Sequence, residues 1–252
     1  MFEFPLVPKL QQASRFILIS FLTVLLLMNS FVANSESMAT TESENQQSNS
    51  ASVVPHSNAD KKRLLKRLGN IQTVSTEFVQ KLFTNDSNDP QITEGTLQVA
   101  GGDKFRLQYT KPYEQLYVAN GEEFLFYDVD LEQITIKPQT QDLANTPAMI
   151  LSNPAVFVEK YYVKINQESH LEEYILTAKA DNSAYNKILL SFKNTRLDTM
   201  LIEDSFGQET ELRFIKIIYN KKIEDSVFHF TPPKDVDVIR STSDNGEKVI
   251  LE

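Results

Sequence analysis

Residues 94–137 read EGTLQVAGGDKFRLQYTKPYEQLYVANGEEFLFYDVDLEQITIK, and this stretch decides the fold. Apolar and polar side chains alternate in five short segments, 95–99, 104–109, 115–119, 123–127 and 133–137. Alternation with a period of two is typical of strands that have one apolar face and one face in water. Between the third and fourth segments, Asn120 and Gly121 are expected to form a tight hairpin turn in which both have positive φ. The stretch therefore predicts an antiparallel meander.

Alternating segments continue on both sides of this stretch. Residues 73–84 carry the pattern of a long first strand. Five later segments carry it as well: 162–166, 174–178, 188–193, 199–203 and 210–219. Residues 249–251 are a candidate edge strand. About eleven strands are too many for one strongly twisted flat sheet, so we expect the sheet to curl toward a barrel.

Two short apolar segments interrupt the strands. Asn145-Thr146-Pro147 precedes residues 148–151, and Asn153-Pro154 precedes residues 155–158. Proline is favoured at the first position of a helix, so both segments are predicted to be short helices. Neither has a polar face wide enough for free solvent, so both are expected to lie on the apolar face of the sheet. The predicted fold is mainly β, an open antiparallel barrel of about eleven strands with a lid of short α-helices over an apolar cavity.

The amino-terminal residues 1–35 have the pattern of a secretory signal peptide. Lys9 and Arg15 precede a 13-residue apolar run at 16–28, and small residues suggest cleavage after Ser35, with Ala39 as the alternative. A membrane anchor is the other interpretation, but about 13 helical residues span roughly 20 Å, against about 30 Å of hydrocarbon. We therefore expect the mature protein to be exported and soluble.

The rest of the chain divides into three parts by composition. Residues 36–59 are polar and are expected to form a flexible leader, because they have almost no apolar surface to bury. Residues 60–240 are the predicted folded domain, and 241–252 are a carboxyl-terminal tail. The domain is expected to begin with a basic amphipathic helix at 61–68, capped by Asp60. Its basic residues either form a solvated face or contact an acidic partner or anionic headgroups; they are Lys61, Lys62, Arg63, Lys66 and Arg67.

Composition argues against several classes of function. The formal charge is −9 and the pI is about 5.0, which disfavours a nucleic-acid partner. The sequence has no cysteine, and His56, His170 and His229 lie far apart, so no metal site or cofactor is expected. No catalytic motif is present, and adjacent carboxylates on a strand point to opposite faces. We expect a protein that is not an enzyme, although catalytic residues distant in sequence, as in a lipid hydrolase, stay open.

The alternating strands carry more apolar surface than two short helices can cover, which predicts a cavity that binds a ligand. The predicted lining is Leu97, Phe105, Leu107, Leu116, Val118, Phe124, Phe126, Ile134 and Ile136. The predicted lid residues are Met149, Ile150, Phe157 and Val158. Most such residues in proteins are ordinary core, so the cavity depends on the surplus of apolar faces.

Short motifs follow one another between residues 64 and 239. They are Phe78-Val79-Gln80, Glu94-Gly95-Thr96-Leu97, Phe105-Arg106 with Tyr109, Asn120-Gly121, Phe126-Tyr127-Asp128, Glu132-Gln133 with Thr135, Asn145-Thr146-Pro147, Asp204-x-x-Gly207-Gln208-x-Thr210 and Phe230-Thr231-Pro232-Pro233. In this order and spacing they resemble the family of periplasmic outer-membrane lipoprotein carrier proteins, LolA.

The resemblance implies an open barrel with a helical lid over an apolar cavity. It also implies partners: acylated lipoproteins as cargo, an inner-membrane lipoprotein-releasing ABC transporter as donor and an outer-membrane lipoprotein receptor as acceptor. Any ATP would be used by the transporter. We expect the carrier to be a monomer. Two alternatives on the same fold are a sensor of lipids or lipoproteins and a carrier of another acylated molecule such as a glycolipid. A sensor would need a further interaction domain, and the sequence after Arg240 does not suggest one.

One position departs from the family's pattern. The family usually has an arginine followed by proline just after the second strand, and this arginine is associated with holding the lid closed. Gly101 and Gly102 stand at these positions here. Arg106 lies nearby and is a possible latch in its place. We hypothesise a looser lid.

Overall fold

The computed structural model describes residues 58–84, 87, 89–139, 147–241 and 248–251. All of them belong to one compact unit, Val54–Glu252. The predicted signal peptide, the leader up to residue 57 and the predicted Asn145-Thr146 cap lie outside the described residues. No helix in the described ranges is both long enough and apolar enough to span a bilayer.

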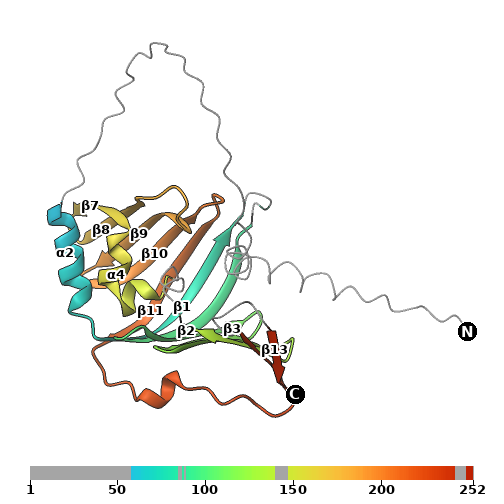
Figure 1. The fold of residues 1–252 in the computed structure, drawn as a ribbon. Coiled ribbons are helices and arrows are strands. Elements are labelled where there is room, and N and C mark those ends of the chain that lie inside the picture. The colour runs from blue at the N-terminus through green and yellow to red at the C-terminus, as the bar shows by residue number, and fades with distance from the viewer. Residues whose placement is uncertain (1–57, 85–86, 88, 140–146, 242–247, 252) are drawn as a thin grey trace, which may run out of the picture. The chain divides into compact units, whose positions relative to one another are not determined.

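The described residues form one sheet of thirteen strands and a few short helices (Figure 1). The strands are β1 Thr73–Phe83, β2 Gln91–Ala100, β3 Lys104–Lys111, β4 Gln115–Asn120, β5 Glu123–Asp128, β6 Gln133–Pro138, β7 Tyr161–Glu168, β8 Leu171–Ala178, β9 Tyr185–Lys193, β10 Arg196–Asp204, β11 Glu209–Tyr219, β12 Asp237–Ser241 and β13 Lys248–Leu251. The helices are α2 Asn58–Gly69, α3 Met149–Ser152, α4 Pro154–Glu159 and the 3-10 helix η3 Asp225–Phe228.

The strands β1 to β11 confirm the eleven segments predicted from alternation, within a few residues at each end. The edge strand predicted at 249–251 is confirmed as β13. The sequence reading missed β12. In the described sheet β12 runs parallel to β6, whereas the other neighbouring pairs are antiparallel. A parallel partner is possible because β12 follows a long connection, not a hairpin.

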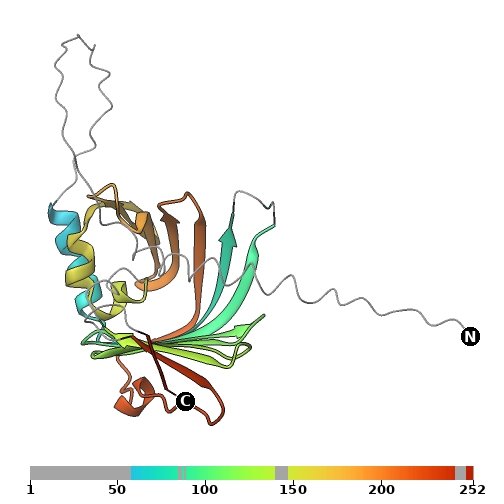
Figure 2. The same cartoon turned by 45° about the vertical axis from the view of Figure 1, so that its right-hand side comes forward.

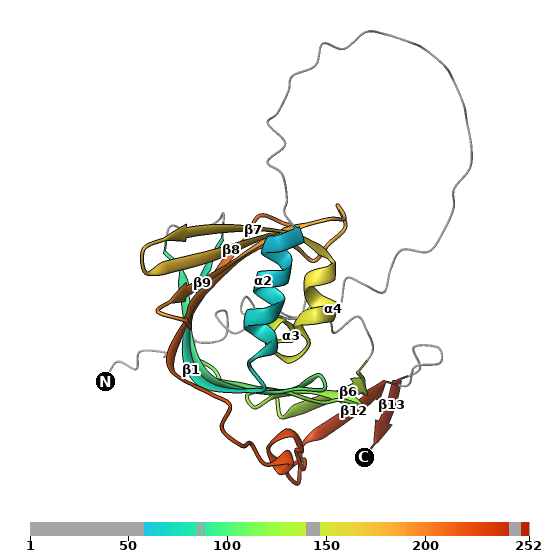
Figure 3. The same ribbon diagram turned by 90° about the vertical axis from the view of Figure 1, so that its left-hand side faces the viewer.

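The sheet is open, because β7 and β13 are its two end strands in the order β13-β12-β6-β5-β4-β3-β2-β1-β11-β10-β9-β8-β7. It curls strongly, and α2, α3 and α4 lie inside the curve (Figure 3). The segment that contains η3 lies outside the curve, beneath β2 and β3 (Figures 1 and 2). The sheet therefore has a concave face toward the helices and a convex face toward the carboxyl-terminal segment.

Helix α2 covers the edge of β7. The side chain of Asp60 accepts a hydrogen bond from the backbone N–H of Ile165 at 3.2 Å. The prediction that Asp60 caps the helix is wrong, since α2 begins at Asn58 and Asp60 lies inside its first turn. Its carboxylate instead satisfies a strand-edge donor, which reduces the tendency of an exposed edge to pair with another chain.

Two of the basic side chains of α2 form ion pairs with the sheet. Glu172 of β8 is buried and forms ion pairs with Arg63, at 2.8 Å, and with Arg67. The hydroxyl of Tyr174 donates to the same carboxylate at 2.7 Å. Lys62 and Lys66 are exposed. Two arginines thus hold the helix on the sheet. The five basic residues therefore do not all face an external partner.

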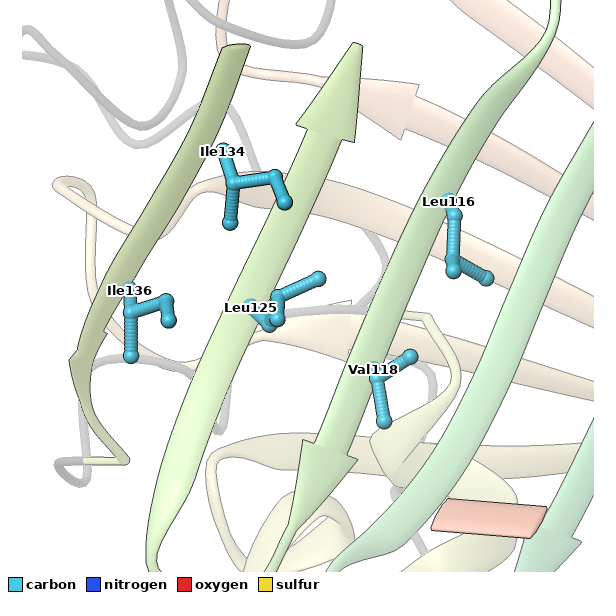
Figure 4. Close-up of a cluster of buried hydrophobic side chains, with 5 residues drawn as sticks. All are labelled: Leu116, Val118, Leu125, Ile134 and Ile136. Atoms are coloured by element: carbon cyan, nitrogen blue, oxygen red, sulfur yellow. The ribbon is translucent and has the colours of Figure 1, made fainter. Parts of the chain in front are cut away.

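The convex face of β4, β5 and β6 carries its own apolar cluster, which we call the outer cluster (Figure 4). Its members are Leu116, Val118, Leu125, Ile134 and Ile136. Side chains from the carboxyl-terminal segment pack on it, namely Phe230, Val236 and Val238, together with Tyr127. Strands β4 to β6 therefore also have apolar packing on their convex face, supplied by the segment around β12.

Gly95 of β2 is required by a close approach. A Cβ atom at this position would lie 2.3 Å from the backbone oxygen of Gln108 and 2.7 Å from the ring of Phe78. Real Cβ atoms do not approach this closely, so a larger residue would displace the ring. The missing side chain lets Phe78 lie flat across its neighbouring strand.

Candidate lipid-binding face

The concave face of the first strands carries connected aromatic rings, which we call the aromatic set. Phe78 on β1 meets Tyr109 on β3 edge to face, with centroids 5.5 Å apart. Tyr109 contacts Tyr117 on β4 at 6.0 Å, and Tyr117 stacks on Phe126 of β5 at 4.7 Å. Phe105 and Phe124 extend the set at 6.3 Å. Rings in these arrangements attract one another beyond simple burial, so the set is a stable apolar surface.

Five of the nine predicted lining residues lie on this concave face. Leu97 lies opposite Leu107. Phe105 lies opposite Ala119, and Ala119 in turn lies opposite Phe124. Phe126 is paired with Thr135. Leu107 is half-buried, and the other four side chains are buried. The register thus places these five side chains on one surface.

The other four predicted lining residues lie on the opposite face. Leu116, Val118, Ile134 and Ile136 belong to the outer cluster, so their assignment to a common surface with Phe124 is wrong. The physical reason is the hairpin between β4 and β5. Its loop is Gly121 and Glu122, which sets Val118 opposite Leu125 and Ala119 opposite Phe124. Residues directly opposite in a sheet share a face, so the even-numbered residues of β4 cannot lie beside Phe124 and Phe126.

The turn itself also differs from the prediction. Gly121 has a φ of 99°, but Asn120 is the last residue of β4 and does not have positive φ. The Asn120 side chain instead accepts hydrogen bonds from the backbone N–H groups of Glu122, at 2.8 Å, and Glu123, at 2.7 Å. Asparagine therefore stabilises the turn through its side chain, not through its backbone conformation.

Three residues of the aromatic set were not among the predicted lining residues: Phe78, Tyr109 and Tyr117. Each is on the concave face by register, since Phe78 and Tyr109 both lie opposite Gly95 and Tyr117 lies opposite Leu107. The alternation could have identified them, because a two-residue loop pairs each odd position with an even one. Once Phe124 is assigned to the inside, Tyr117 and Ala119 follow.

The four predicted lid residues are buried beneath the helices that carry them. Met149 and Ile150 belong to α3, and Phe157 and Val158 to α4; Ile150 and Val158 have no exposed surface. Phe157 stacks on Tyr161 of β7, with centroids 5.1 Å apart and planes at 13°.

The start of α4 is as predicted. The side chain of Asn153 accepts a hydrogen bond from the backbone N–H of Val156 at 3.4 Å, and Pro154 occupies the first helical position. Lys61 of α2 pairs with Glu159 at 2.6 Å, so the two helices are joined at the end of α4. Val156 remains largely exposed.

A row of polar side chains follows the aromatic set along one end of the strands. Gln80 lies opposite Thr93, and Tyr109, Gln115, Asp128 and Gln133 lie opposite one another in turn across β3 to β6. The Tyr109 hydroxyl donates to Gln80 Oε1 at 2.9 Å, and Gln115 Nε2 donates to Asp128 Oδ2 at 3.0 Å. We call these six residues the polar row.

The tyrosine hydroxyls of the concave face are kept neutral. Burial raises the pKa of Tyr109 and Tyr117 well above the usual value of a phenol, and the charge of Asp128 adds to the effect at Tyr117. Burial also raises the pKa of Tyr161 to about 12. All three hydroxyls therefore keep their protons at neutral pH and can donate hydrogen bonds.

The sequence matches a known protein family over most of the folded domain. The model of the family described as "Outer membrane lipoprotein carrier protein LolA" matches residues 69–231. The chain belongs to the LolA family. The match runs from the end of α2 to just beyond η3, so it includes the aromatic set, the polar row and both short helices.

Curated relatives agree with this assignment. An outer-membrane lipoprotein carrier protein from Neisseria meningitidis serogroup B is 36% identical over 167 residues, which are 66% of this chain and 80% of the relative. One from Hahella chejuensis is 36% identical over 176 residues, which are 69% of this chain and 84% of that protein. A crystal structure of a LolA superfamily protein from Nitrosomonas europaea matches 68% of this chain and 98% of its own, with 13% identity and a TM-score of 0.42.

Arg106 does not occupy the position of a lid latch in this LolA family member. It lies opposite Val118 of the outer cluster, and its guanidinium donates to the backbone oxygen of Val227 at 3.5 Å. Burial against this segment lowers the pKa of the guanidinium. Arg106 is thus on the convex face, away from α3 and α4. Gly101 and Gly102 form the turn before β3, and Gly102 has a φ of 77°.

The described part of this LolA family member holds no group of three or more histidine, cysteine, aspartate or glutamate side chains that could bind a metal ion. The concave face offers instead aromatic and aliphatic surface with neutral hydroxyl and amide groups at one end. Such a surface can bind an apolar chain and hydrogen-bond a neutral polar group, as ligand sites generally do.

Proposed function

We propose that this chain is a periplasmic carrier that binds the acyl chains of lipoproteins on its concave face. The observation that carries the proposal is the aromatic set on the concave face, inside the curve in which α3 and α4 lie (Figure 3), in a chain of the LolA family. Relatives about 36% identical are named outer-membrane lipoprotein carrier proteins. The carrier acts without catalysis and without a bound cofactor.

The energetics of acyl chains make such a surface necessary. Moving one methylene group from a bilayer into water costs about 0.8 kcal/mol, so a chain of about 16 carbons faces roughly 13 kcal/mol. The concave face replaces most of these contacts with aromatic and aliphatic ones. The replacement has to be incomplete, because cargo that is bound too tightly is not released.

Cargo binding requires the cover to move. Phe105, Tyr109, Phe124 and Phe126 are all buried in this structure, so an acyl chain reaches them only when α3 and α4 shift. The helices are suited to this, since α3 has four residues and α4 has six. The energy for release from the inner membrane comes from a partner ABC transporter, and an outer-membrane receptor accepts the cargo.

Photo-crosslinking tests the proposal with two adjacent aromatic residues. Phe126 points into the aromatic set, whereas Tyr127 points to the outer cluster, where it packs near Phe230 at 5.6 Å. The full chain is produced with p-benzoylphenylalanine at position 126 or at position 127, together with an acylated lipoprotein. We expect crosslinking to the lipoprotein from position 126 and none from position 127.

Position 127 is the control, because Phe126 and Tyr127 are neighbours on one strand, have side chains of similar size and point to opposite faces of the sheet. Crosslinking from position 127 alone, or from neither position while both variants are folded, would contradict the proposal. Crosslinks to a glycolipid and none to lipoprotein would favour the other carrier alternative.

A further inference from the structure

The concave face changes character along the strands. At one end lie the side chains of Val74, Val99, Phe105, Ala119 and Phe124, which follow one another by register and are all buried. At the other end lies the polar row. Lys137 lies opposite Phe124 at this apolar end, with its Nζ 5.8 Å from the ring centroid, so the polar row is the end that offers neutral hydrogen-bonding groups to the polar end of a ligand.

The hydroxyl of Thr93 is the feature that points to a ligand. Its Oγ1 atom is buried and has no hydrogen-bond partner in the part of the chain that the structure describes. Thr93 lies opposite Gln80, whose Oε1 atom accepts the hydrogen bond of Tyr109. A buried hydroxyl without a partner is unfavourable for the empty protein, and few native groups are left in this state. A hydrogen-bond acceptor from outside the chain would satisfy it.

The charges of the polar row restrict the acceptor. Asp128 is buried, and the other members are Gln80, Thr93, Tyr109, Gln115 and Gln133, so the row contains a carboxylate and no cationic side chain. A fatty-acid carboxylate or a phosphate placed here would meet a like charge in a region of low dielectric constant. A neutral carbonyl oxygen, as in an ester or amide, accepts a hydrogen bond without this penalty.

We infer that the polar row binds the neutral carbonyl groups at the root of carbonyl-linked acyl chains, with Thr93 as a donor, while the chains lie on the aromatic set. This inference rests on the proposed function, because it specifies the ligand class and its orientation on the same face. The free ends of the chains then point toward Val74 and Phe124. Thr93 determines specificity, and the aromatic set supplies most of the affinity.

The test uses two neutral probes that differ only in the carbonyl groups. One is 1,2-dipalmitoylglycerol, which has ester linkages, and the other is 1,2-dihexadecylglycerol, which has ether linkages. Binding of each to the full chain is measured in mixed detergent micelles. We expect the ester to bind about five- to tenfold more tightly than the ether, the effect of about one net hydrogen bond.

Two threonine variants on the same strand assign the preference. Thr93→Val removes the hydroxyl at nearly constant shape and is expected to reduce the ester preference to about twofold or less, with unchanged affinity for the ether. Thr96→Val is the matched control, because Thr96 lies opposite Glu77 on the convex side and is exposed. It is expected to keep the full preference.

The outcomes separate this inference from the proposed function. If the parent protein binds neither probe, acyl binding itself fails. If it binds both probes equally, or if Thr93→Val keeps the ester preference, the inference is wrong and acyl binding stands. Loss of the preference in Thr93→Val, with the preference kept in Thr96→Val, supports it. The comparison in the parent protein needs no variant, so a misfolded variant does not prevent a decision.

Discussion

Two threonines of the concave face differ in how their hydroxyls are satisfied. The Thr76 hydroxyl lies within hydrogen-bond distance of two backbone oxygens, that of Ile215 at 2.9 Å and that of Glu77 at 2.8 Å, to which it can donate its one proton. Thr93 is buried at its hydroxyl and has no such partner in the described part of the chain. Both are on neighbouring strands, so they provide a matched pair in which the same substitution should have opposite effects.

Thr93→Val is expected to stabilise the empty protein. Removing an unsatisfied buried hydroxyl relieves a penalty of about 1–3 kcal/mol, which corresponds to a rise in Tm of about 2–12 °C for a domain of this size. Thr76→Val removes hydrogen bonds that are made, so its Tm should fall. Thermal unfolding followed by circular dichroism measures both. A Tm for Thr93→Val that is unchanged or lower would show that its hydroxyl is satisfied in solution.

Helix α2 is an element held by charge as well as by packing. Leu64 and Leu68 are buried beneath it, and Arg63 and Arg67 share the buried carboxylate of Glu172. Arg67 also lies over the ring of Phe192, 4.7 Å from its centroid. Because one carboxylate serves two arginines, its loss should loosen the helix more than the loss of an exposed ion pair.

Glu172→Gln is expected to lower the free energy of unfolding by about 2 kcal/mol, because it leaves Arg67 with a weaker hydrogen bond in a partly buried site. Glu77→Gln is the control, since Glu77 pairs with Lys216 at 3.0 Å on the exposed surface. Such pairs contribute about 0–1 kcal/mol. Urea unfolding gives both values. Equal effects of the two substitutions would mean that Glu172 does not fasten α2.

The lid helices should open more readily than the sheet beneath them. They are short, and Arg106, the residue considered as a latch, lies on the other face. We expect backbone amides of α3 and α4 to exchange hydrogen for deuterium faster than those of β1 to β4 in the empty protein, by about tenfold or more. Exchange that is as slow in residues 149–158 as in these strands would contradict a loose lid.

At the scale of the whole molecule, the two faces of the sheet should separate stability from binding. Ile134 has no exposed surface and belongs to the outer cluster. Ile134→Ala should lower the free energy of unfolding by about 2–5 kcal/mol. It should leave the affinity of the folded protein for dipalmitoylglycerol unchanged, since no member of the outer cluster faces the helices. A parallel loss of affinity would show that the two faces are coupled.

The sequence predicts the elements of this fold better than it predicts their faces. Alternation gives each strand from β1 to β11, because period two is a local property. The face on which a residue such as Val118 lies depends on whether the hairpin loop has an even or an odd number of residues. An error of one residue in the loop length assigns every side chain of the strand to the opposite face. The outer cluster was missed for a second reason. Phe230, Val236 and Val238 lie in a segment with two prolines and no long alternation, so nothing local predicted that it covers β4 to β6.

The outer cluster has a consequence for the proposed movement of the helices α3 and α4. A sheet with one buried face would lose much of its apolar packing each time the helices moved aside. Here Phe230 and Val238 pack against the outer cluster of β4 to β6, on the face away from α3 and α4. We therefore expect the packing on the convex face of β4 to β6 to stay in place when the helices move, so that these strands keep their shape whether or not a ligand is bound.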